Sequence, residues 1–442
     1  TSVSWWSSPR WVQEYCKHSA VYFRNLQEFA DSCTQCDRVD IPTGVAAMLD
    51  TMEFDYHPPR WLPDGHSQTI WSALYARAWR GKRPRYTRIR WDAPDGDFVD
   101  VDWLQSDPGQ RARSSWHGAD AASAHSQPGR RAGAVAAPVS AVRPAPARPC
   151  AQGRQEALLV LFHGLEGSSA SHYALAMADR ARELGWAFAV PMFRGCSGET
   201  NRAARAYHSG DWSEVDWILQ RMQDWKDAQL GPAAPLYVAG VSLGGNALLR
   251  WAQQQGEQAQ DLASAIAVIS APLDLAACGH ALHRGFNRVS YERMFLSTMK
   301  HKARHKARQF PGLFDLQRVL RARSLFDFDD AFTGPLHGFE GADDYWRRAS
   351  SRPYLSALRI PTLLLNARND PFVPASVLPT RAEVPDCVTL WQPGAGGHAG
   401  FAGGHWPGQL FGMPRAVTDW MRATCATMGN KGLVGSLEVG DG

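Results

Sequence analysis

Ser242 is the residue whose surroundings point most directly to covalent chemistry. It lies at the centre of Gly240–Gly244, between an apolar, β-branched run and a segment with a helical pattern. A serine on a sharp turn from a strand to a helix presents its hydroxyl above the sheet, where it can attack a carbonyl carbon. Gly240 and Gly244 leave room for the strand and the helix to approach each other. The five-residue pattern also arises by chance, so its place between a strand and a helix is what makes Ser242 the predicted nucleophile.

Asp370 and His398 occupy the positions that a serine nucleophile requires of its partners. The hydroxyl needs an imidazole that takes its proton and a carboxylate that fixes the tautomer of the imidazole. Asp370 follows the predicted strand 362–366, and His398 lies in a glycine-rich loop after the predicted strand 388–391. A serine, an acid and a histidine in this order, each on a loop after a strand, form the triad of one large class of hydrolases. We therefore predict that Ser242, Asp370 and His398 are the catalytic residues.

The same residue types allow other interpretations. Asp370 precedes a proline and would also fit an ordinary turn, and His405 competes with His398 for the role of base. His398 lies nearer to the preceding strand, which favours it. Glu383 and Asp386 come before that strand, on the opposite rim of the sheet, and we expect both to be solvated.

The negative charge that develops on the attacked carbonyl oxygen needs preorganised backbone N–H donors. Leu243 follows the nucleophile and supplies one donor. The second is expected in the loop after the predicted strand 157–162, where we assign it to Leu165. His163 and Gly164 begin this loop, and we interpret His163 as a residue that braces the loop rather than as a base.

These residues need a scaffold of parallel strands. The predicted strands are 86–91, 98–104, 157–162, 186–192, 236–239, 265–270, 362–366 and 388–391. The predicted helices that cover them are 170–184, 211–230, 245–254 and 409–425. Strands that alternate with helices predict an α/β protein with a mostly parallel, doubly wound sheet. Ligands then bind above the carboxyl ends of the strands, where Ser242 lies.

Composition shifts divide the chain into segments. We predict an N-terminal extension of unclear status over 1–55 and a first part of the core over 56–272, with a flexible insertion at 105–155. An inserted helical lid follows over 273–356. A second part of the core over 357–427 carries the acid and the base, and 428–442 form a loose tail. The lid contains a helix over 291–310 whose apolar residues, Met294, Phe295, Met299, Ala303, Ala307 and Phe310, are predicted to share one face. Its lysines and arginines are predicted to lie largely elsewhere, as solvated charge, with contact to anionic lipid headgroups as the alternative.

Charge and composition exclude several classes of function. The 47 basic and 43 acidic residues leave a net charge of +4, which is too balanced to argue for a nucleic-acid partner. No apolar run reaches the roughly 18 residues of a membrane span, and no signal sequence is evident, so we expect a cytoplasmic protein without a transmembrane segment. The histidines show no pairing on a helix face that would hold a metal, and we expect no catalytic metal.

Besides the single residues, seven short sequence motifs are similar to motifs of one protein family. They are Trp61–Thr69, His163–Ser169, Phe193–Glu199, Tyr207–Gly210, Pro335–Phe339, Asn369–Pro371 and Gly397–Phe401, together with the turn around Ser242. The sequence resembles the YheT-type α/β hydrolases, also called the AB hydrolase-4 family, over about residues 60–425. The resemblance implies the α/β-hydrolase fold, the same three catalytic residues and hydrolysis of carboxylic esters without a cofactor. It places the family's histidine at His398, which weakens the case for His405, and it leaves the two ends and the insertion at 105–155 unexplained.

The expected function is therefore that of a serine esterase, with an acyl or lipid-like ester as its small-molecule substrate. An acyltransferase would use the same triad with an alcohol or a thiol in place of water. A third interpretation is a non-catalytic α/β module that binds a partner through the insertion or the basic lid helix. The oligomeric state does not follow from the sequence.

Overall fold

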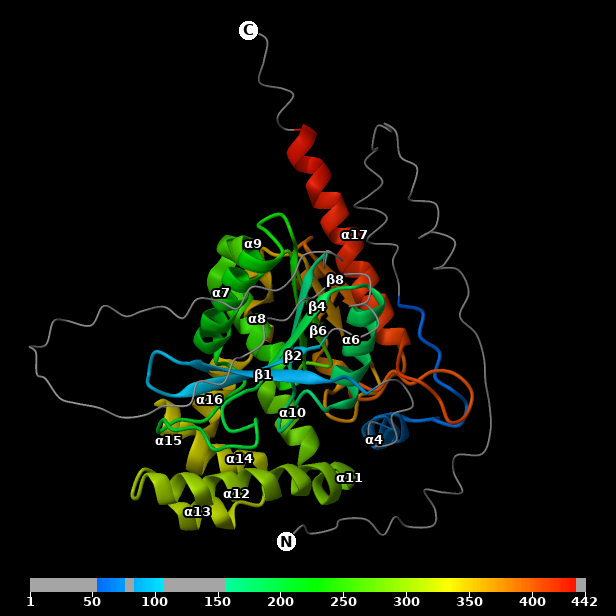
Figure 1. Cartoon of the computed structure of the whole chain (residues 1–442). Coiled ribbons are helices and arrows are strands. Elements are labelled where there is room, and N and C mark those ends of the chain that lie inside the picture. Colours follow the sequence, from blue (N-terminus) through cyan, green and yellow to red (C-terminus); the bar gives the residue numbers. More distant parts are fainter. Residues whose placement is uncertain (1–53, 76–82, 106–155, 435–442) are drawn as a thin grey trace, which may run out of the picture.

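The computed structural model describes residues 54–75, 83–105 and 156–434, with side chains up to residue 425. The predicted extension over 1–55 and the predicted insertion over 105–155 therefore lie almost entirely outside the described residues. An eight-stranded sheet occupies the centre of the molecule (Figure 1), in the strand order β1-β2-β4-β3-β5-β6-β7-β8. The strands are β1 Tyr86–Asp92, β2 Phe98–Leu104, β3 Leu158–Phe162, β4 Ala187–Pro191, β5 Leu236–Val241, β6 Ala265–Ile269, β7 Thr362–Leu365 and β8 Val388–Trp391.

The pairing of the strands confirms the mostly parallel sheet. β1 and β2 form an antiparallel hairpin whose edge pairs antiparallel with β4. From β4 to β8 all neighbours are parallel. The carboxyl ends of β3, β5, β6, β7 and β8 therefore meet at one edge of the sheet, where loops from distant parts of the sequence come together.

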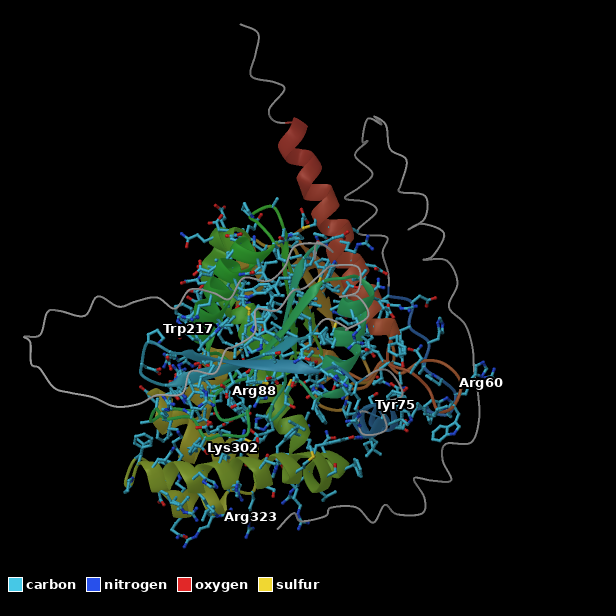
Figure 2. The ribbon with its side chains drawn as sticks, viewed as in Figure 1. Arg60, Tyr75, Arg88, Trp217, Lys302 and Arg323 are labelled. Carbon is cyan, nitrogen blue, oxygen red and sulfur yellow. The ribbon has the colours of Figure 1, made fainter. Side chains whose placement is uncertain are left out.

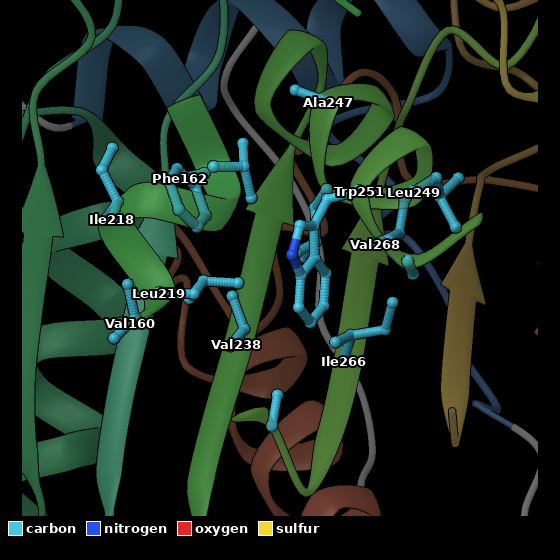
Figure 3. Packing of buried hydrophobic residues seen from close by; sticks show 14 of the residues in the cluster. Val160, Phe162, Ile218, Leu219, Val238, Ala247, Leu249, Trp251, Ile266 and Val268 are labelled. Carbon is cyan, nitrogen blue, oxygen red and sulfur yellow. The ribbon is translucent and has the colours of Figure 1, made fainter. Parts of the chain in front are cut away.

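The sheet is buried on both faces because its strands carry apolar side chains on both sides. In β3 the side chains of Val160 and Phe162 belong to one hydrophobic cluster, and those of Leu159 and Leu161 belong to another. α7 (Trp212–Gln229) and α8 (Leu243–Gln255) cover the first face. Figure 3 shows Ile218 and Leu219 of α7 and Trp251 of α8 against the strands on this side. α6 (His172–Glu183) and α17 (Gly412–Val434) cover the second face.

A layer of helices connects β6 to β7, and we call it the helical insertion (residues 275–357). Its elements are α10 Leu275–Leu282, α11 Gly285–Asn287, the π-helical turn η4 Arg288–Glu292, α12 Arg293–Gln309, α13 Leu316–Arg321, α14 Leu325–Phe328, the π-helical turn η5 Asp329–Thr333, α15 Gly334–His337, α16 Ala342–Ala349 and the 3-10 turn η6 Arg352–Ala357. These helices form a hydrophobic cluster of their own and lie together at one end of the molecule (Figure 1).

The remaining elements are short or lie at the margins of the sheet. They are α4 Gly65–Tyr75, η3 Gly256–Gln258, α9 Ala259–Leu262, η7 Ala375–Val377 and η8 Arg381–Glu383. α17 continues to Val434, so its last turns occupy residues that were predicted to be a loose tail. Among the described helices, none combines the length and the apolar character that crossing a bilayer requires.

The face assignment predicted for α12 is wrong in part. Met294 was predicted to share the apolar face, but its side chain is 55% exposed. Lys302 and Lys306 were predicted to point away, but both line a cavity together with Phe295 and Met299. These four positions follow one another at intervals of three and four residues, so the inward stripe starts at Phe295 rather than at Met294. Burial of the two lysines is tolerated because carboxylate and carbonyl oxygens accept hydrogen bonds from their ammonium groups.

Candidate active site

Ser242 stands at a strained turn between β5 and α8. Its backbone has φ 54° and ψ −122°, a conformation that residues with a side chain rarely adopt. A Cβ atom at Gly240 would lie 2.7 Å from the carbonyl oxygen of Gly244, and a Cβ at Gly244 would lie 2.5 Å from the carbonyl oxygen of His163. Glycine is therefore required at both positions by the close approach of strand, helix and neighbouring loop.

The structure brings Ser242, His398 and Asp370 together. Nε2 of His398 lies 2.9 Å from Oγ of Ser242, and Nδ1 of His398 lies 2.9 Å from Oδ2 of Asp370. Oδ1 of Asp370 accepts the backbone N–H groups of Phe372 and Val373 at 2.8 and 3.3 Å. This leaves Oδ2 free to accept the Nδ1–H group of His398, so the Ser242 hydroxyl can donate to Nε2.

His398 is held in place by residues that the sequence analysis did not single out for a role. Thr69 Oγ1, on α4, accepts the backbone N–H of His398 at 2.8 Å. The amide oxygen of Gln68 accepts the N–H of Gly396 at 2.8 Å. On the other side, Ser270 Oγ accepts the N–H of Ala399 at 2.9 Å. Gln68 and Thr69 belong to the motif Trp61–Thr69, which carries part of the family resemblance. Nothing in the sequence pointed to their role of holding the loop of His398.

His163 braces the loop after β3. Its Nδ1 lies 2.8 Å from the carbonyl oxygen of Gly164, and its Nε2 accepts the N–H of Phe193 at 3.1 Å. Both contacts are met by a neutral imidazole with its proton on Nδ1, and complete burial lowers the pKa of His163 to about 4. Gly164 in turn donates its N–H to the hydroxyl of Tyr173 at 2.9 Å. Leu165 follows, and it lines the cavity beside Ser242 together with Leu243.

Glu166, the next residue of this loop, is tied to the helical insertion. Its φ is 56°, and its N–H donates to the hydroxyl of Tyr207 at 3.0 Å. Its Oε1 accepts the Tyr207 hydroxyl at 2.7 Å and Nζ of Lys302 at 2.7 Å. Nζ of Lys302 also lies 3.3 Å from Sγ of Cys196. Burial acts against the Lys302 ammonium, but Cys196 and Glu166 outweigh it, and the pKa of Lys302 is raised. Figure 2 shows Lys302 on the helical insertion below the sheet.

A cavity of about 160 Å³ lies between the carboxyl edge of the sheet and the helical insertion. Ser242 and His398 open onto it, and most of its other walls are apolar. The apolar lining from the insertion comprises Leu275, Cys278, Leu282, Phe295, Met299, Leu325, Phe328, Phe332 and Trp346. Asp329 also lines it and accepts hydrogen bonds from Thr333 and Trp346. Burial raises the pKa of Asp329 to about 6.

The competing residues lie elsewhere. His405 is exposed and does not line this cavity. Glu383 and Asp386 are exposed as well, and they pair with Arg352 and Arg381 respectively. Within residues 54–75, 83–105 and 156–425, no group of three histidine, cysteine or carboxylate side chains has the arrangement of a metal site.

Comparison with known proteins agrees with this architecture. The family model described as "alpha/beta hydrolase fold" matches residues 157–404. The chain belongs to the α/β hydrolase fold family. Within that family it is 32% identical over 369 residues to "Putative esterase YheT" of Escherichia coli (strain K12), a match that covers 83% of this chain and 93% of that protein. The resemblance to the YheT-type hydrolases is thereby confirmed.

More distant relatives carry related names. The human protein "Phospholipase ABHD3" is 30% identical over 267 residues, which are 60% of this chain and 63% of that protein. Among solved structures, an esterase from Pyrococcus furiosus has 12% sequence identity and a TM-score of 0.41, over 77% of this chain and 88% of that chain.

Proposed function

We propose that this protein is a serine hydrolase that cleaves carboxylic esters through Ser242, His398 and Asp370. The observation that carries the proposal is the pair of 2.9 Å contacts that link the three side chains at the wall of a cavity. The named activities of the relatives, an esterase and a phospholipase, are consistent with this chemistry.

In the proposed first half-reaction, Oγ of Ser242 attacks the ester carbonyl carbon while Nε2 of His398 takes its proton. Asp370 accepts the Nδ1–H of His398 and stabilises the imidazolium that forms. The backbone N–H groups of Leu165 and Leu243 donate to the oxyanion. When the C–O bond breaks, His398 gives its proton to the leaving alcohol. In the second half-reaction, water attacks the acyl group and His398 again moves the proton, which releases the acid and restores Ser242.

The walls of the cavity indicate an apolar acyl group. Aromatic and aliphatic side chains of the helical insertion face Ser242 across the cavity, and such walls bind the apolar part of a ligand better than a charged part. We therefore propose an acyl or lipid-like ester as the substrate and the helical insertion as the lid over it.

Covalent labelling tests the proposed nucleophile. A fluorophosphonate probe should label the wild-type protein and should not label Ser242→Ala, because the probe forms its bond with an activated serine. Ser213→Ala changes an exposed serine on α7 and serves as the matched control, with labelling expected to be unchanged. Equal labelling of the wild type and Ser242→Ala would contradict the proposal. The acyl product formed from p-nitrophenyl esters of graded chain length, with and without an added alcohol acceptor, then separates hydrolysis, which gives the free acid, from acyl transfer, which gives the ester of the acceptor.

The contact between Lys302 and Glu166 gives a second prediction. Lys302→Met removes the ammonium that holds the loop of the proposed donor Leu165, so the turnover number should fall about ten- to hundredfold, less than the loss of a whole oxyanion-hole donor. The KM should change little, because the loop acts mainly on the transition state. Lys302→Arg keeps the charge and should recover part of the turnover.

Arg304→Met is the matched control, since Arg304 is an exposed cation on the same helix. A rise in KM with an unchanged turnover number in Lys302→Met would assign Lys302 to substrate binding and contradict a positioning role.

A further inference from the structure

The outer surface of α11, η4, α12 and α13 has an unusual charge balance. Residues 284–323 contain eleven lysines and arginines but only two acidic residues, Glu292 and Asp315. Glu292 is buried, with 1% of its surface exposed, and is occupied by His283 and the backbone N–H of Leu325. The exposed basic residues of this surface are Arg284, Arg288, Arg293, Arg304, Arg308, Arg318, Arg321 and Arg323. We call this surface the basic face; Arg323 on it is labelled in Figure 2.

The basic face also carries the two most exposed large apolar side chains of the described residues, Val289 at 66% and Met294 at 55%. Phe286, on the same face, is 43% exposed. All three lie within the first turns of one continuous helical stretch, α11 to α12. Single exposed apolar residues are common on protein surfaces, but a group of three among arginines indicates a surface that contacts something apolar and anionic together.

A chain of ring contacts connects this apolar group to the proposed active site. The ring centroids of Phe286 and Tyr291 are 5.9 Å apart. Those of Tyr291 and Phe372 are 4.6 Å apart. The ring centroids of Phe372 and His398 are 4.3 Å apart. The opposite side of α12 contributes Phe295 to the cavity wall. The helix that presents Met294 to the outside thus also forms part of the cavity wall. Figure 1 shows α11 and α12 below the sheet in this view.

We propose that the basic face docks onto the surface of an anionic lipid bilayer. The arginines would lie among the lipid phosphates, and Phe286, Val289 and Met294 would enter the boundary between headgroups and acyl chains. Because the basic face is positively charged, the surface that it contacts must carry negative charge. The exposed apolar side chains favour a lipid bilayer over a soluble acidic protein. This docking determines where the protein is located, so it goes beyond ester hydrolysis and does not depend on it.

Binding of the full chain to lipid vesicles tests this docking without any measurement of turnover. The wild type should sediment with vesicles of phosphatidylcholine and phosphatidylglycerol and should bind vesicles of phosphatidylcholine alone at least tenfold more weakly. Arg288→Gln with Arg293→Gln should weaken binding about 25-fold at low salt, about fivefold for each arginine. Val289→Ser with Met294→Ser should weaken it about tenfold or more, through the loss of inserted apolar surface.

Matched controls change the same residue types on other surfaces. Ile89→Ser alters an exposed β-branched side chain on β1, and Arg221→Gln with Arg359→Gln removes the same charge from exposed positions outside the helical insertion. Both should bind as the wild type does. Failure of the wild type to bind anionic vesicles, or equal binding by all variants, would overturn the proposal. Binding to polyglutamate that depends on Arg288 and Arg293 but not on Val289 and Met294 would assign the basic face to an acidic protein instead.

Discussion

His398→Ala should lower ester turnover by about a millionfold, close to the rate without the triad. Without the imidazole, nothing at Oγ of Ser242 can take the proton as the ester is attacked, and nothing can return it to the alcohol. Among the described residues, the base that contacts this hydroxyl is His398, whose Nε2 lies 2.9 Å from Oγ. The measurement is the turnover number on a p-nitrophenyl ester at saturating substrate.

The control and the double variant make this result specific. His405→Ala should retain activity close to that of the wild type, because His405 is exposed and lies away from the cavity. His398→Ala combined with Ser242→Ala should be no slower than either single variant, since the residues of a triad act as one unit. If His405→Ala lost activity and His398→Ala kept it, the competing assignment of the base would be right and the proposed mechanism wrong.

The sequence was sufficient to predict the sheet and to select the residues that the structure brings together. The turn at Ser242 and the loops of Asp370 and His398 each follow a short apolar run, and local pattern is enough to recognise such runs as strands. Once the strands are parallel, their carboxyl ends must meet, so three residues far apart in the sequence converge. The fold class and the family were therefore within reach of the sequence.

The contacts that hold the site were not within reach of the sequence. Gln68 and Gly396 are 328 positions apart, and their hydrogen bond depends on how α4 packs beside the last loop of the sheet. The inward direction of Lys302 depends on Glu166, which is 136 positions away. Local periodicity assigned this lysine to the solvent because a charged side chain is usually exposed. Only the tertiary partner makes its burial favourable, and no pattern within α12 reveals that partner.

Asp370→Asn should lower turnover about ten-thousandfold while the fold and KM remain close to those of the wild type. The amide keeps the size of the carboxyl group, and Oδ1 can still accept the N–H groups of Phe372 and Val373. The other position then holds an NH2 group that faces Nδ1 of His398 at 2.9 Å. Two donors cannot share this contact, so the imidazole moves its proton to Nε2 and can no longer accept the proton of the serine. Asp386→Asn, at an exposed carboxyl group, should leave turnover unchanged. A loss below tenfold in Asp370→Asn would mean that Asp370 only shapes its turn.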